Sequence, residues 1–310
     1  MWIQAVVLIV SLFVLAWSAD KFVDGSCGVA KYFGISPFLI GMVIVGFGTS
    51  APEMLVSATS ALAGSPSIAL GNAYGSNIAN IALILGVAAI VNPIKVDKSL
   101  LKKELPFLLF TIPLTVLLIL DGEISRIDAV ILLAVFLVIM VVSSLGKKEE
   151  ISEDGETGEK VSILKSLFFL VLGLTLLVSS SKALVWAAKE IAEWLGISEL
   201  IIGLTIIALG TSLPELASSV SAARKNEHEV AFGNVVGSNL FNTLCVVGIA
   251  AAIKPVLADP KILLRDIPIV SVLTLLLFVF AARQKIGRFS GVLLLILYFA
   301  YNTLLSLKII

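Results

Sequence analysis

The chain has 310 residues, of which 58% are hydrophobic and only 14% are charged, and its mean hydropathy is +1.07. This composition excludes an ordinary soluble globular domain and predicts a protein embedded in a lipid bilayer. The 22 Lys and Arg balance the 22 Asp and Glu, and the sequence has no dense basic patch, so no nucleic-acid partner is expected.

Ten segments are long and apolar enough to cross a bilayer as helices, because one spanning helix needs about 20 mostly apolar residues. The first segment ends in Asp20 and Lys21, with Asp24 just beyond it, rather than in a small-residue cleavage site, so we expect a span and not a signal peptide. We therefore expect a multi-pass protein of the cell membrane, surrounded by lipid. The predicted spans cover residues 3–22, 37–63, 67–91, 105–120, 127–145, 164–186, 200–223, 230–253, 267–282 and 289–307.

The second half of the sequence repeats the first at an offset of 162 residues. Gly-Thr-Ser-x-Pro-Glu at 48–53 recurs at 210–215, and Gly-Asn-x-x-Gly-Ser-Asn-x-x-Asn at 71–80 recurs at 233–242. Each half holds five predicted spans, and because five is odd, equivalent helices cross the bilayer in opposite directions. The predicted fold is an all-α membrane protein of ten transmembrane helices, arranged as two inverted five-helix repeats (residues 1–145 and 163–310). Inverted repeats are typical of secondary transporters.

Residues 146–162 join the two halves and form an acidic linker that is too short for a folded domain. Lys and Arg are unequally divided between the two ends of the predicted spans, and the richer end is the one that carries this linker. By the positive-inside rule we expect a cytoplasmic linker and extracellular termini.

Glu53 and Glu215 lie near the middle of the second and seventh predicted spans. A charge at that depth costs several kcal/mol, so an intramembrane carboxylate indicates a functional site. Pro52 and Pro214 precede the glutamates, and a proline inside a helix frees the carbonyl four residues earlier. Freed carbonyls are tolerated in a membrane where they line a cavity or bind something. Carboxylates, carbonyls and hydroxyls together favour a hard cation over a transition metal.

The third and eighth predicted spans each carry a polar stripe. Asn72, Ser76 and Asn80 recur at four-residue spacing, which places them on one side of a helix. The stripe either faces the cation site or joins helices; for Asn77 and Asn239 the joining role is favoured, and for Asn72 and Asn234 both roles stay open. The small residues that let these spans pack closely on the broken helices are Gly71, Gly75, Gly233 and Gly237.

The two Gly-Thr-Ser-x-Pro-Glu motifs and the asparagine-rich motifs that follow them resemble the alpha-repeats of the calcium/cation antiporter superfamily, in its sodium/calcium exchanger branch. The resemblance implies that Glu53 and Glu215 bind Ca²⁺ together with the backbone carbonyls of Thr49 and Thr211. It also implies sodium sites built from hydroxyls, carbonyls and amides. These belong to Ser50, Ser212, Ser76, Ser238, Gly46, Ala208, Asn80 and Asn242.

Relatives that depend on potassium, and some sodium/calcium exchangers, have an aspartate at the position of Asn242. This departure from the family's pattern implies that the chain works without potassium. With both amides neutral, the empty centre carries two negative charges, which are costly to move through a low-dielectric barrier. One Ca²⁺ or at least two Na⁺ balance that charge, so we expect exchange of Na⁺ for Ca²⁺ by alternating access. We expect this exchange to be electrogenic, as any count above two Na⁺ per Ca²⁺ makes it.

Other functions fit less well. A proton/calcium antiporter is the alternative, since two protons on the glutamates neutralise the site equally. An enzyme is not expected, because no span contains a histidine or a nucleophile beside a base. A calcium-binding receptor needs a docking domain for which the chain has no room. Ca²⁺ and Na⁺ are therefore expected as transported substrates, with no cofactor and no obligate protein partner.

Overall fold

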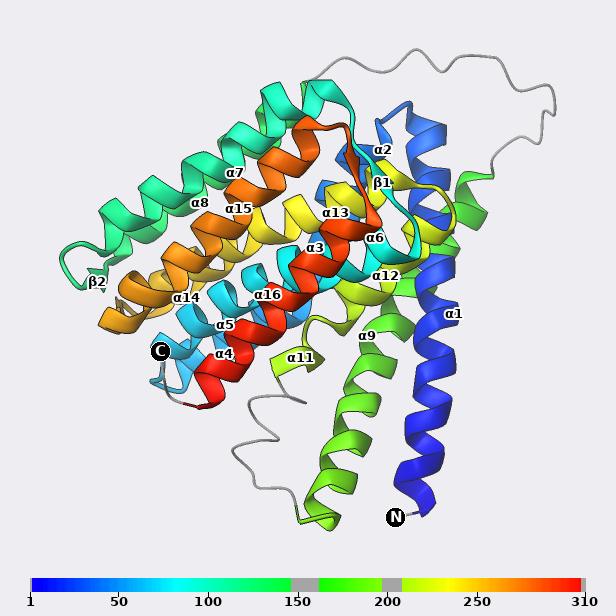
Figure 1. Cartoon of the computed structure of the whole chain (residues 1–310), viewed down its shortest axis with the longest axis horizontal. Helices are drawn as coiled ribbons and strands as arrows, with labels where there is room; N and C mark the ends of the chain where they lie inside the picture. The colour runs from blue at the N-terminus through cyan, green and yellow to red at the C-terminus, as the bar shows by residue number, and fades with distance from the viewer. Residues whose placement is uncertain (1, 146–161, 197–207, 308–310) are drawn as a thin grey trace.

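Two 32-residue helices, α1 (Trp2–Phe33) and α9 (Ile163–Trp194), lie side by side along one edge of the molecule (Figure 1). The computed structural model describes residues 2–145, 162–196 and 208–307, so the predicted linker lies outside them except for Ser162, which caps α9. Glycines let the two helices touch: a Cβ at Gly25 would lie 2.7 Å from Ser166 O, and one at Gly173 would lie 2.5 Å from Phe22 N.

The remaining helices form a bundle beside this pair (Figure 1). In the first half they are α2 (Pro37–Leu39), η1 (Ile40–Val45), α3 (Gly46–Thr49), α4 (Ala51–Leu62), α5 (Ser67–Ile78), η2 (Ala79–Ile84), α6 (Leu85–Val91), α7 (Lys98–Ile119) and α8 (Arg126–Ser144). In the second half they are α11 (Ala208–Gly210), α12 (Leu213–Arg224), α13 (His228–Leu240), η4 (Phe241–Val246), α14 (Val247–Ile253), η5 (Ile262–Asp266), α15 (Ile267–Ala282) and α16 (Arg288–Ser306). The η segments are π-helical turns, which are frequent at functional sites.

Two short antiparallel ribbons join the halves at the helix ends. β1 (Ile94–Lys95) pairs with β4 (Lys285–Ile286), and β2 (Glu123–Ile124) pairs with β3 (Val256–Leu257). Each ribbon therefore takes one strand from each half of the sequence. The pairing ties the two halves into one bundle.

The two Gly-Thr-Ser-x-Pro-Glu motifs interrupt their helices as predicted. The chain bends by 44° between α2–α3 and α4, because Pro52 is the second residue of α4 and cannot donate to the carbonyl of Gly48. In the second half α11 ends at Gly210 and α12 begins at Leu213, with Pro214 at the matching place. Ser181 of α9 donates a hydrogen bond of 2.9 Å to the freed carbonyl of Gly210.

Among the described residues, seven helices are long and apolar enough to span a membrane, or eight if the bent pair counts as one span. Two of the ten predicted spans are not among these eight. One is α7, whose first two turns carry Lys98, Lys102, Lys103 and Glu104. The other is the window 200–223, of which residues 200–207 lie outside the described part of the chain. The span count of ten stays a prediction.

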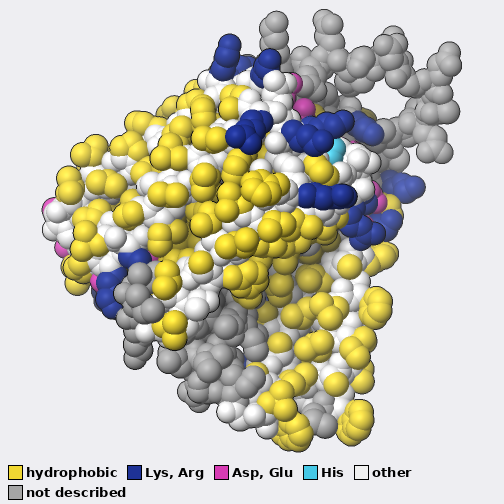
Figure 2. All heavy atoms as spheres, viewed as in Figure 1, with side chains coloured by type: hydrophobic (Ala, Val, Ile, Leu, Met, Phe, Trp, Pro, Cys, Tyr) yellow, Lys and Arg dark blue, Asp and Glu magenta, His cyan; other side chains and the backbone are white. Residues whose placement is uncertain are grey.

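The centre of the bundle is formed by α5–η2–α6 and α13–η4–α14, whose residues are mostly buried. The outer helices α1, α8, α9 and α16 expose apolar side chains instead, as expected for helices that face lipid. Figure 2 shows this apolar surface and a cluster of Lys and Arg at one end of the molecule. The exposed side chains include Phe13, Leu137, Phe168 and Phe299.

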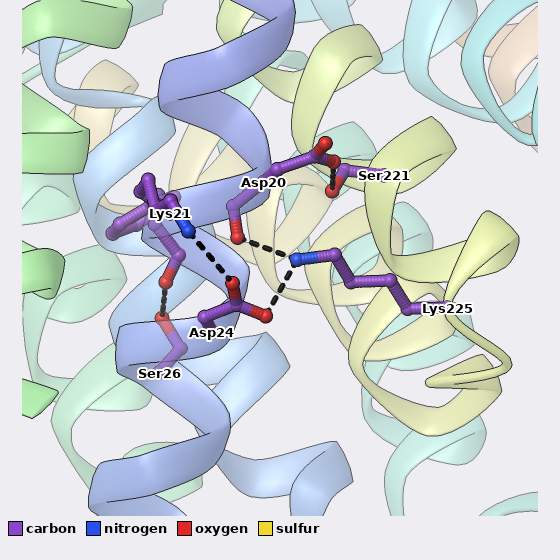
Figure 3. A network of polar contacts seen from close by, with 7 residues as sticks. Asp20, Lys21, Asp24, Ser26, Ser221 and Lys225 are labelled. Atoms are coloured by element: carbon purple, nitrogen blue, oxygen red, sulfur yellow. Dashed lines mark hydrogen bonds and ion pairs between the residues drawn. The ribbon is translucent and has the colours of Figure 1, made fainter.

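A polar network fastens α1 to α12 at the lysine-rich end (Figure 3). Lys225 Nζ donates to Asp20 O at 2.7 Å and pairs with Asp24 Oδ1 at 2.5 Å, while Ser221 Oγ bonds to the Asp20 carboxylate. At the offset of 162 residues, the positions equivalent to Asp20 and Asp24 hold Lys182 and Trp186. The network is therefore built into only one of the two related interfaces.

Candidate cation-binding site

Glu53 and Glu215 are brought together in the centre of the bundle, each in the first turn after a helix break. Their side chains are 1% and 2% exposed. Ser50 Oγ, at the first break, donates a 3.1 Å hydrogen bond to Glu215 Oε1. Thr211, at the second break, and the Glu215 carboxylate both lie close to the Glu53 carboxylate. Each carboxylate therefore meets the helix break of the opposite half.

Six buried oxygens of residues that the sequence places in the cation site have no hydrogen-bond partner among the described residues. Buried polar atoms in folded proteins are almost always paired, so such a group needs an explanation, for which a bound ion is one candidate. The atoms are Glu53 Oε2, Glu215 Oε2, Ser212 Oγ, Ser238 Oγ, Asn80 Oδ1 and Asn242 Oδ1.

Asn72 and Asn234 brace the backbone of the glutamates. Asn72 Nδ2 donates to Glu53 O at 3.2 Å and to Ser57 Oγ at 3.0 Å. Asn234 repeats this pattern in the second half, with Glu215 O at 3.3 Å and Ser219 Oγ at 2.9 Å. The sequence left open whether Asn72 and Asn234 face the cation site or join helices. Their Nδ2 atoms join helices. The part played by Ser57 and Ser219 is new, and their recurrence at the offset of 162 is the signal that points to it.

Thr49 connects the two halves at the first break. Its side chain is buried, and Thr49 Oγ1 donates to Val45 O at 2.9 Å and lies 3.2 Å from Asn234 Oδ1. The carbonyl of Gly46, a predicted sodium ligand, accepts the Ser50 N–H at 3.0 Å, and Thr49 Oγ1 lies 3.4 Å from the same oxygen. Ala208 begins α11, and its surroundings lie outside the described residues.

Ser76 on α5 and Ser238 on α13 are buried, and Asn80 and Asn242 lie in the π-helical turns η2 and η4. Asn80 Nδ2 donates to Asn239 Oδ1 at 3.1 Å. Asn77 Nδ2 donates to Thr243 Oγ1 at 2.7 Å. Asn77 and Asn239 therefore join the two halves, as the sequence favours.

Close helix packing in the second half is confirmed. A Cβ at Gly237 would lie 2.7 Å from Met42 Cα, and one at Gly233 would lie 2.9 Å from Met42 N, so α13 rests directly on η1. For Gly71 and Gly75, no described atom lies within 4 Å of such a Cβ. The segment equivalent to η1 is 202–207, which lies outside the described residues, so the packing of these two glycines stays a prediction.

The charge of the two glutamates is not balanced by any ion pair seen in the described part of the chain. Removing two carboxylates from water without partners costs several kcal/mol each. The described residues contain no cluster of three or more His, Cys, Asp and Glu. The donors that surround the pair are hydroxyl, amide and carbonyl oxygens, which suit a hard cation such as Ca²⁺ or Na⁺.

Comparison with known proteins agrees with a membrane protein that binds such cations. The inner membrane protein YrbG of Escherichia coli is 37% identical over 95% of this chain and 94% of its own length. The sodium/calcium exchanger MaX1 of Methanosarcina acetivorans is 31% identical over 98% of both chains. A solved structure of the sodium-calcium exchanger NCX_Mj, soaked with 10 mM Na⁺ and zero Ca²⁺, matches with a TM-score of 0.86 at 38% identity, covering 97% of this chain and 98% of that chain.

The family model described as sodium/calcium exchanger protein matches the chain twice, over residues 3–145 and 165–307. The two matches together take in nearly all of both halves. The fold, the buried glutamate pair and these likenesses agree, and the chain belongs to the sodium/calcium exchanger protein family.

Proposed function

We propose that this chain is a secondary active antiporter that exchanges Na⁺ for Ca²⁺ across the cell membrane by alternating access. The observation that carries the proposal is the meeting of Glu53 and Glu215, equivalent residues of the two halves, in a buried oxygen-rich centre without a basic partner among the described ion pairs. The names of its relatives support cation exchange over an enzymatic role.

The proposed topology is ten membrane spans in two inverted repeats, with extracellular termini and a cytoplasmic linker. Support comes from the family model, whose two matches begin at residues 3 and 165, the same offset that relates the sequence motifs. Further support comes from the seven or eight apolar helices of the described residues, each of which overlaps one predicted span.

The proposed ligand assignments are those that the resemblance to the alpha-repeats implies. Ca²⁺ is proposed to bind Glu53 and Glu215 with the carbonyls of Thr49 and Thr211. Na⁺ is proposed to use the side chains of Ser50, Ser212, Ser76, Ser238, Asn80 and Asn242 and the carbonyls of Gly46 and Ala208. The unpaired oxygens of Ser212, Ser238, Asn80 and Asn242 support this assignment.

The proposed cycle depends on charge balance. The empty site carries two uncompensated negative charges and resists movement through the membrane, whereas one Ca²⁺ or two or more Na⁺ neutralise it. A count above two Na⁺ per Ca²⁺ makes the exchange electrogenic. Because Asn242 is neutral, the site needs no K⁺ to neutralise its charge.

Flux in proteoliposomes tests the proposal. We expect ⁴⁵Ca²⁺ uptake driven by an outward Na⁺ gradient, lost in Glu53→Gln and in Glu215→Gln, and kept in the surface control Glu193→Gln. Uptake that ignores Na⁺ and follows a pH gradient would favour the proton/calcium antiporter. Uptake that survives both glutamate substitutions would remove the proposed site.

A further inference from the structure

A second polar centre, separate from the residues of the predicted cation site, is enclosed by α5, α7, α13, η4 and α15. It is a cavity of about 10 Å³, and its polar lining comes from Tyr74, Asn77, Thr111, Thr115, Asn239, Thr243 and Thr274. All of these side chains are buried. A cavity holds one water molecule when it offers about 10–15 Å³ of space to a water-sized sphere and two to four polar partners.

Four polar atoms of this lining have no hydrogen-bond partner among the described residues: Tyr74 Oη, Asn77 Oδ1, Asn239 Nδ2 and Thr274 Oγ1. Thr115 lies near the Tyr74 hydroxyl without meeting hydrogen-bond geometry. Each unpaired buried group costs about 1–3 kcal/mol. Four such groups around one water-sized cavity match the number of hydrogen bonds that one water molecule makes.

The remaining bonds of the two asparagines fix which atoms are left for this cavity. Asn77 Nδ2 is used by Thr243 Oγ1 at 2.7 Å, which leaves Asn77 Oδ1 as an acceptor. Asn239 Oδ1 is used by Asn80 Nδ2 at 3.1 Å, which leaves Asn239 Nδ2 as a donor. A water molecule can accept from Asn239, donate to Asn77 and bond to the hydroxyls of Tyr74 and Thr274.

We propose that this cavity binds one structural water, and that the water holds Asn239 in place so that Asn80 presents its Oδ1 to the sodium site. Asn239 is thus a positioning residue, because it touches Asn80 and not the ion. The effect on sodium rests on the proposed function, whereas the water site itself does not.

Thermal unfolding of the purified full chain tests the water without transport. Thr274→Val keeps the shape of the side chain and removes its hydroxyl, and Tyr74→Phe does the same on α5. If a water bonds to them, both variants lower the melting temperature by a few degrees. A rise in both would overturn the proposal, because removal of an unsatisfied buried hydroxyl stabilises a protein. Thr175→Val is the control, since the Thr175 hydroxyl is exposed and bonds to Val171 O of its own helix.

Flux measurements on the same variants test the positioning role. We expect Thr274→Val and Tyr74→Phe to raise the half-saturating Na⁺ concentration by roughly fivefold, the change that a net hydrogen-bond contribution of about 1 kcal/mol gives, with a smaller change in maximal rate. An unchanged half-saturation in both variants would reject the positioning role. Anomalous signal in the cavity of a crystal soaked in Rb⁺ would show that a cation occupies the cavity in place of water, and would overturn the proposal.

Discussion

Ser50 and Glu215 lie 165 residues apart in the sequence, yet Ser50 Oγ donates a 3.1 Å hydrogen bond to Glu215 Oε1. The serine belongs to the helix break of the first half, and the glutamate belongs to the second. Thr211, at the break of the second half, lies close to Glu53, whereas the Oγ of Ser212, the residue equivalent to Ser50, has no hydrogen-bond partner among the described residues. The site is therefore shared, because the carboxylate of each half lies at the break of the other.

We expect Ser50→Ala to lower the stability of the ion-free protein by about 1.5–3 kcal/mol, the contribution of a hydrogen bond to a charged group. The loss is smaller with saturating Ca²⁺, because the cation then meets the carboxylate that lost its donor. Thermal unfolding with chelator and with Ca²⁺ measures both values. Ser180→Ala is the control, since Ser180 Oγ bonds to Leu177 O of its own helix. Equal losses in the two conditions would argue against a cation at Glu215.

Asn234→Ala is expected to destabilise the protein more than Asn72→Ala. Asn234 bonds to Glu215 O and Ser219 Oγ and also lies 3.2 Å from Thr49 Oγ1, whereas within the described part of the chain Asn72 shows the first two kinds of bond alone. Each lost bond contributes about 0.5–1.5 kcal/mol net, so the difference is about 1 kcal/mol. Denaturation of the two variants in detergent gives the comparison, with Asn302→Ala as a reference on the outer helix α16. A larger effect at Asn72 would contradict the bonding pattern.

The parts of the site that the sequence predicts are those set by local chemistry. Pro52 and Pro214 interrupt their helices because a proline has no N–H, and this holds whatever lies nearby. The offset of 162 residues likewise identifies Ser57 and Ser219 as equivalent. Helix periodicity gives the face on which a side chain lies, but it does not say which helix that face meets.

Contacts between the halves therefore need the three-dimensional structure. Examples are the bonds from Ser50 to Glu215 and from Asn80 to Asn239. The spacing of these residues in the sequence does not predict that they meet. The one-sided network of Asp20 and Lys225 breaks the repeat and has no counterpart in the motifs. The strands that pair across the halves are two residues long, too short for an alternating pattern to reveal.

Gly237→Ala is expected to destabilise the bundle by about 1–3 kcal/mol, the usual cost of overpacking. The added Cβ would lie 2.7 Å from Met42 Cα, and backbone cannot move aside as a flexible side chain can. Gly287→Ala is the comparison, because no described atom lies within 4 Å of its added Cβ and any loss there reflects the weaker N-cap that Ala gives α16. Melting temperatures of the two variants test this, and an unchanged value for Gly237→Ala would contradict the close contact of α13 with η1.

Asn242→Asp adds a third carboxylate to a centre that already holds Glu53 and Glu215. Asn242 is buried and its Oδ1 has no partner among the described residues, so the new charge has nothing but cations to balance it. One Ca²⁺ then leaves a net charge of −1, and moving that charge through the barrier is costly. Calcium transport by this variant should need an additional monovalent cation or a proton.

We therefore expect ⁴⁵Ca²⁺ flux of Asn242→Asp to be slower than wild type in choline medium and to recover with added K⁺ or at lower pH. Wild-type flux should not respond to K⁺. Each added positive charge, whether K⁺ or a proton, moves the net charge of the loaded site back toward zero. Removal of K⁺ or a rise in pH should therefore not restore the flux. Asn302→Asp, on the outer helix α16, controls for the new carboxylate itself. Flux of Asn242→Asp that equals wild type and ignores both K⁺ and pH would show that charge balance at this centre does not control transport.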